Sequence, residues 1–121
     1  MKRLSEKEEA LMHIIWRLKK AFAKEVREEL APPKPHINTV ATTMKRLADK
    51  GYLKIEDFGS TYRYAPAISK KEYTNRFLKP LLSSFFGNSM KNVVSFFAEE
   101  EEISTEELKE IIDIIEKRKE R

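Results

Sequence analysis

A chain of 121 residues, 36% charged and 40% hydrophobic, has the composition of one globular domain or of a small domain with an appendage. It contains no cysteine, which excludes disulfides, thiolate metal sites and cysteine nucleophiles, and its apolar runs are too short to span a membrane. The first residues lack the apolar region of a secretory signal, so the expected location is the cytoplasm.

Positive charge is concentrated in the N-terminal part. Residues 1–70 carry 15 Lys and Arg against 9 Asp and Glu, a balance of +6, whereas residues 71–121 carry 9 against 11, a balance of −2. This asymmetry is typical of a polyanion-binding module joined to a C-terminal part with another role. A difference of eight charges can also arise by chance.

The first helix is predicted from a capping box, because Ser5 and Glu8 have the required spacing. It should begin at Ser5 and end near residues 19–20, with an apolar stripe of Leu4, Leu11, Ile14, Ile15 and Leu18. Residues 21–23 are expected to form a short connection, and a second helix of about two turns is expected around Val26.

The segment from Ile37 to Leu53 is read as one helix that is closed by Gly51 and followed at once by a strand. Gly51 is expected to end the helix in a left-handed conformation. Its apolar residues recur at a helical period: Ile37, Val40, Ala41, Met44, Leu47 and Ala48. The opposite face carries Asn38, Thr39, Thr42, Thr43, Lys45 and Arg46. Thr and Asn are poor helix formers, so this face suits a helix that lies close to a DNA duplex better than an ordinary solvated helix.

Prolines 32, 33 and 35 end the preceding helix and make a stiff turn, which gives a helix-turn-helix arrangement. After it, residues 52–56 and 61–65 alternate between residue classes around a glycine-containing turn, which predicts a β-hairpin. Three helices and a hairpin make a winged helix, in which Lys54 and Arg63 are the cations available to DNA. Tyr62 and Tyr64 of this hairpin either take part in the approach to DNA or simply pack the hairpin on the helices. Packing is favoured for Tyr64.

The C-terminal part is predicted to be helical. Capping boxes at Ser69 and Ser104 each begin a helix, Pro80 should kink or split the first of these, and residues 87–89 should break it and begin another. Apolar residues on these helices exceed what three short helices bury alone, so a homodimer is expected. Its interface residues would be Phe77, Leu81, Phe85, Val94, Leu108, Ile111, Ile112 and Ile115. The alternative is packing onto the winged helix of the same chain.

These residues resemble the penicillinase-repressor family, which includes the BlaI, MecI and copper-responsive repressors. Residues 11–16 resemble its first-helix signature, residues 38–47 and 49–53 its recognition helix and exit, and residues 62–66 the end of its wing. The resemblance implies a mainly α fold with a winged-helix DNA-binding domain at 1–68 and a helical dimerisation domain at 69–121. It also implies a dimeric repressor of a palindromic operator, with Asn38, Thr39, Thr42, Thr43 and Arg46 facing the major groove or its phosphates.

Two departures from the family leave the inducing signal open. In the β-lactam branch an Asn-Phe bond of the fifth helix is cut; the equivalent pair here is Ser95-Phe96, so cleavage by a sensor protease is doubtful. The copper branch uses paired cysteines, which this chain lacks.

The main hypothesis is therefore a homodimeric, sequence-specific repressor on double-stranded DNA, without a cofactor, a metal or a membrane partner. Lys45, Lys54 and Arg63 would add sequence-independent affinity. The alternative is a winged helix used for protein–protein interaction, against which the Thr-rich face argues. An enzyme is not expected, because His13 and His36 lie in separate elements without an acid partner or a cysteine.

Overall fold

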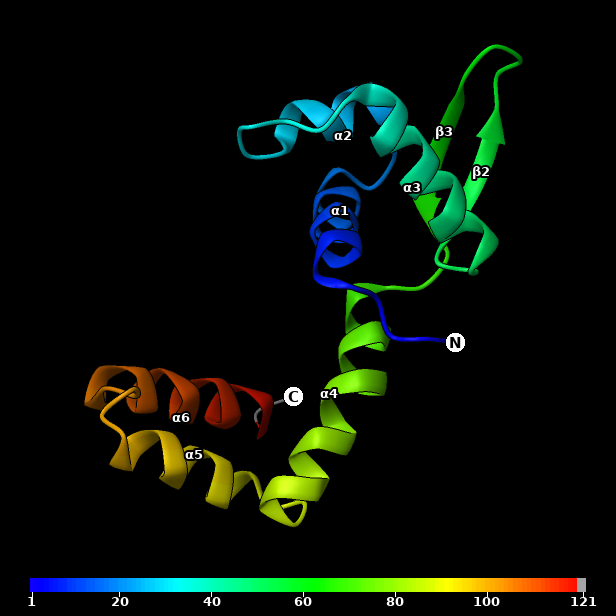
Figure 1. Cartoon of the computed structure of the whole chain (residues 1–121). Helices are drawn as coiled ribbons and strands as arrows, with labels where there is room; N and C mark the ends of the chain where they lie inside the picture. Colours follow the sequence, from blue (N-terminus) through cyan, green and yellow to red (C-terminus); the bar gives the residue numbers. More distant parts are fainter. Residues whose placement is uncertain (120–121) are drawn as a thin grey trace. The chain divides into compact units, whose positions relative to one another are not determined.

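The computed structural model describes residues 1–119, and the chain divides into two compact units, residues 1–77 and the part from Leu78 onward (Figure 1). The first unit contains helices α1 (Glu6–Leu18), α2 (Ala23–Glu29) and α3 (Ile37–Asp49) and strands β1 (Ala21–Phe22), β2 (Leu53–Asp57) and β3 (Tyr62–Pro66). Helix α4 (Lys70–Phe86) begins in the first unit and is followed by α5 (Met90–Glu99) and α6 (Thr105–Lys119). The prediction of a mainly α winged-helix fold is confirmed.

The sheet has three antiparallel strands in the order β1-β3-β2, with Tyr64 of β3 paired to both Ala21 and Ile55. The expectation of a plain connection at residues 21–23 was therefore wrong: residues 21 and 22 form a strand, and Ala23 begins α2. Ala21 is completely buried, and its small side chain lets the strand lie against the core. A two-residue strand gives no period-two signal, so the pattern could not reveal it.

The core of the first unit lies between the three helices and the inner face of the sheet. Its fully buried side chains are Met12, Ile15, Val26, Val40, Met44, Leu47 and Tyr52. The predicted stripe of α3 is confirmed at Val40, Met44 and Leu47, whereas Ile37 in the first turn is exposed. Gly51 has φ +89°, the left-handed conformation that the sequence predicted after α3.

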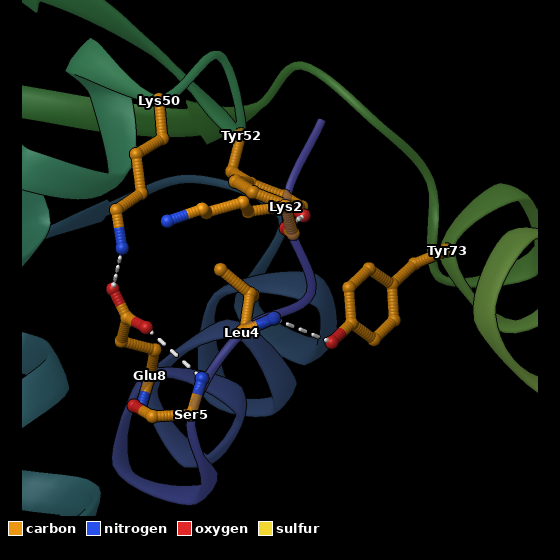
Figure 2. Close-up of polar contacts among 7 residues, drawn as sticks. All are labelled: Lys2, Leu4, Ser5, Glu8, Lys50, Tyr52 and Tyr73. Atoms are coloured by element: carbon orange, nitrogen blue, oxygen red, sulfur yellow. Dashed lines mark hydrogen bonds and ion pairs between the residues drawn. The ribbon is translucent and has the colours of Figure 1, made fainter.

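Polar contacts tie the N-terminal segment to α3 and to the start of α4 (Figure 2). The Leu4 amide donates to the hydroxyl of Tyr73 at 3.1 Å, and the Tyr52 hydroxyl donates to the Lys2 carbonyl. Tyr73 is itself buried and lies 4.8 Å from Phe77, centroid to centroid. The first turns of α4 therefore pack on the core of the first unit, although a domain boundary at residues 68 and 69 remains a prediction from the sequence.

The helices from residue 69 onward begin as predicted. The Ser69 hydroxyl accepts from the Glu72 amide and the Ser104 hydroxyl from the Glu107 amide, both at 3.0 Å, and Ser89 caps α5. Gly87 and Asn88, with φ +59° and +63°, make the turn before α5. Pro80 does not split α4, which is 17 residues long and continues past the proline to Phe86. None of the helices within residues 1–119 is both long and apolar enough to cross a membrane.

Glu8 is the one buried charged residue of residues 1–119, and it supports the start of α1 (Figure 2). Its carboxylate accepts from the Lys50 ammonium at 2.8 Å and from the Ser5 amide at 3.0 Å. Burial alone would raise the pKa of this carboxyl, but the hydrogen bonds from Lys50 and Ser5 outweigh it and hold the pKa below its ordinary value of 4.5.

Glu8→Gln is expected to destabilise the protein by about 1–3 kcal/mol at pH 7, because a neutral amide replaces the buried carboxylate that accepts from Lys50 and Ser5. A pKa lowered by folding stabilises the protein above the unfolded value and loses that contribution as pH falls through the folded value. The unmodified protein should therefore lose stability below about pH 4.5 more steeply than Glu8→Gln. Urea unfolding at pH 7 and pH 3.5 measures both effects, and Glu6→Gln on the exposed side of α1 is the control. If the unmodified protein and Glu8→Gln lost the same stability between pH 7 and pH 3.5, the lowered pKa of Glu8 would be contradicted.

Candidate nucleic-acid interface

Most residues on the polar face of α3 are exposed. Asn38, Thr39, Thr42, Lys45 and Arg46 are exposed, and Thr43 is half-buried. Residues 38, 42, 45 and 46 follow one helical stripe and residues 39 and 43 the adjacent one, because positions three, four, seven and eight apart share a face. The six predicted α3 residues therefore form one continuous surface, which we call the α3 polar face.

Local hydrogen bonds fix the start of this face. The Nδ1 atom of His36 accepts from the Asn38 amide at 3.1 Å and so caps α3. The Thr43 hydroxyl donates to the Thr39 carbonyl at 2.9 Å. His36 thus has a structural role, and His13, 5.4 Å from the Trp16 ring, belongs to another helix.

A hollow of about 520 Å³ lies between α3 and β3. It is lined by Ala41, Thr42, Lys45, Arg46, Asp49, Tyr62 and Tyr64. Tyr64 is buried, as the packing interpretation predicted, and burial raises the pKa of its hydroxyl. Tyr62 is 39% exposed and reaches the same hollow from the wing, which the sequence left undecided.

Two predicted cations are engaged by neighbouring acids. The Lys45 ammonium lies 2.9 Å from a carboxylate oxygen of Asp49, and this hydrogen bond raises the pKa of Lys45. The Arg63 guanidinium lies 2.6 Å from Glu56 and 5.2 Å from the ring centroid of Phe58. Arg46 and Lys54 form no ion pair within the residues that the structure describes.

The wing presents its cations on the side opposite to the hollow. Tyr64 points to the core, so its neighbour Arg63 points to the outer face of the sheet, where it pairs with Glu56 across the strands. Lys54 shares that outer face, since it lies two residues from Glu56 on β2. The structure therefore brings together Thr42, Lys45 and Arg46 with Tyr62, and keeps Lys54 and Arg63 apart from them.

The second unit exposes most of its large apolar side chains. Of the eight residues predicted for a dimer interface, Leu81, Phe85, Ile111, Ile112 and Ile115 are exposed, Val94 and Leu108 are half-buried, and Phe77 packs against the core of the first unit. Leu78, Met90, Phe96 and Ile114 add exposed apolar area that the predicted set omitted. From Leu78 to residue 119, Val93 is the one buried hydrophobic residue. This unit therefore has almost no core of its own.

The pair Ser95-Phe96 lies inside α5, and both residues are exposed. The Phe96 ring lies 5.7 Å from that of Phe86 at the end of α4. Serine occupies the position before the phenylalanine, as the sequence shows, so cleavage at this bond remains doubtful.

A helix-turn-helix with an exposed polar second helix, followed by a hairpin on a three-stranded sheet, defines the first unit as a winged helix. The family model described as penicillinase repressor matches residues 4–117, almost the whole chain. The chain belongs to the penicillinase-repressor family, which comprises repressors rather than enzymes.

Individual relatives cover nearly the full length at modest identity. The chain is 29% identical over 119 residues to the penicillinase repressor of Bacillus licheniformis, covering 98% of this chain and 93% of that protein. It is 30% identical over 106 residues to the penicillinase repressor of Staphylococcus aureus, covering 87% and 84%. With the methicillin resistance regulatory protein MecI of Staphylococcus aureus (strain N315) it shares 25% identity over 116 residues, covering 95% and 94%.

Proposed function

We propose that this protein is a cytoplasmic, homodimeric transcriptional repressor that binds a palindromic operator through α3. The two α3 helices of a dimer would enter successive major grooves, about one helical turn (~34 Å) apart. Repression follows where the operator overlaps a promoter. The observation that carries this proposal is the α3 polar face: six adjacent polar residues, five of them exposed, on a helix whose other side is anchored in the core.

Arg46 is the strongest proposed contact, because it is exposed and has no acidic partner within residues 1–119. A guanidinium reads guanine through two hydrogen bonds or holds a phosphate equally well. The methyl groups of Thr39, Thr42 and Thr43 suit thymine methyl groups, and Asn38 can pair with adenine. Lys45 would contact the sugar–phosphate backbone beside α3, and Lys54 and Arg63 would contact it from the outer face of the wing. Such contacts fix the position of the protein without reading sequence.

The dimer is supported by the exposed apolar residues of the second unit. Ile112 and Ile115 on α6 are 56% and 49% exposed, and Phe85 on α4 is 76% exposed. Soluble monomers rarely leave a contiguous set of such side chains in water, and two-fold pairing covers identical surfaces on both chains at once.

Titration of the protein on genomic fragments, followed by footprinting of the bound ones, tests the proposal. The expected result is a protected inverted repeat whose half-sites are about one helical turn apart. Equal affinity for random duplex with no protected repeat would reject specific repression. In that case a winged helix that binds another protein becomes the better explanation, and a pull-down would identify the partner.

A further inference from the structure

The ion pair in the hollow between α3 and β3 carries a consequence for the proposed DNA binding. Lys45 projects from the α3 polar face, yet its ammonium lies 2.9 Å from the carboxylate of Asp49, one turn further along the helix. Both side chains line the hollow together with Arg46 and Tyr62. A negative charge therefore stands among the groups that would face a DNA strand.

We infer that Asp49 is an affinity-limiting residue: it competes with DNA phosphates for Lys45. This inference rests on the proposed function and deepens it. Asp49 occupies one donor of the Lys45 ammonium and offsets its charge, so a phosphate binds Lys45 at full strength only when the Lys45–Asp49 pair is broken. Arg46 forms no ion pair within the described residues, so no such pair has to be broken before it contacts DNA.

The physical effect of such a residue is a lower affinity for DNA of any sequence. Phosphate contacts bind every sequence and so supply essentially all of the non-specific affinity. Weakening one of them lowers the affinity for all sequences equally, so a larger fraction of the protein is free of DNA, while the ratio of operator to random affinity, which base contacts set, is unchanged.

The experiment compares Asp49→Asn with the unmodified protein on the footprinted operator and on a random duplex of equal length, across a series of salt concentrations. An exposed ion pair of this spacing changes an equilibrium by roughly a factor of two per subunit, so the variant dimer should bind both duplexes at least roughly fourfold tighter. If Lys45 gains a phosphate in each subunit, the slope of log affinity against log salt should steepen by about 1.8. The ratio of operator to random affinity should not change.

Further variants make the test specific. Asp113→Asn removes the same kind of acid from an i,i+4 pair with Lys117 on α6, and should leave DNA affinity unchanged. The double variant Lys45→Met/Asp49→Asn should bind no tighter than Lys45→Met alone, because the inference assigns the whole gain to Lys45.

The outcomes separate the inference from the function on which it rests. If the unmodified protein binds DNA but Asp49→Asn binds it no more tightly than Asp113→Asn does, the inference is overturned and the proposed function still stands. A gain that persists in the double variant would show general charge repulsion and would also overturn it, as would a gain confined to the operator. Absence of binding by the unmodified protein on every duplex would overturn the proposed function and the inference together.

Discussion

Ile112→Glu is expected to convert a dimeric protein into a monomer and to abolish tight operator binding. Two-fold symmetry would place the new carboxylate in the interface twice, and an unpaired charge buried among apolar side chains costs about 3 kcal/mol or more. The dimer dissociation constant should rise at least about 100-fold, a factor that corresponds to about 2.8 kcal/mol. Sedimentation velocity across a concentration series measures this change, and fluorescence anisotropy with labelled operator measures its effect on DNA binding.

Lys117→Glu provides the matched control for this variant. It introduces the same side chain on the same helix, but Lys117 lies on the face of α6 away from Ile112, with a side chain that is 78% exposed. The control should remain dimeric. A monomeric unmodified protein, or equal dimerisation of the two variants, would contradict the proposed interface.

Arg46→Ala should weaken operator binding by about 1–3 kcal/mol for each subunit's contact, so roughly 2–6 kcal/mol for a dimer if the two contacts add. The loss should be larger on the operator than on random duplex if Arg46 reads a base, and equal on both if it contacts phosphate. Anisotropy titrations at one fixed salt concentration distinguish these results.

Arg17→Ala is the control for charge, because Arg17 is an exposed arginine of the same unit that lies on α1 and pairs with Glu29. It should change affinity far less than Arg46→Ala does. If the operator affinity of Arg46→Ala stays within twofold of the unmodified protein, α3 does not carry the recognition.

The sequence predicted the elements that have strong local signals. Capping boxes located the starts of α1, α4 and α6, and the 3.6-residue period located the buried side of α3. Both signals depend on residues within a few positions of one another. In α1 and α3 packing agrees with them, because both helices bury apolar residues in the core of the first unit.

Features that depend on distant residues were not predictable in the same way. The strand β1 exists because residues 21 and 22 pair with residues 63 and 64, some forty positions away. The separation of Arg63 from α3 follows from the register of β3 and from the burial of Tyr64, which the alternation of the wing did not resolve. The pair of Lys45 with Asp49, by contrast, has the i,i+4 spacing at which helical side chains meet, so the sequence alone was enough to predict it.

Serine caps at the starts of α4, α5 and α6 have a consequence for how two chains come together. Each of these helices carries its own start signal in the adjacent three residues, independent of any contact with a second chain. A capped helix needs less stabilisation from a partner in order to form, so the proposed dimer would pay a smaller entropic penalty on assembly than a disordered tail would. Encounter of two preformed surfaces, rather than ordering of a disordered tail, would then limit the rate at which the repressor forms.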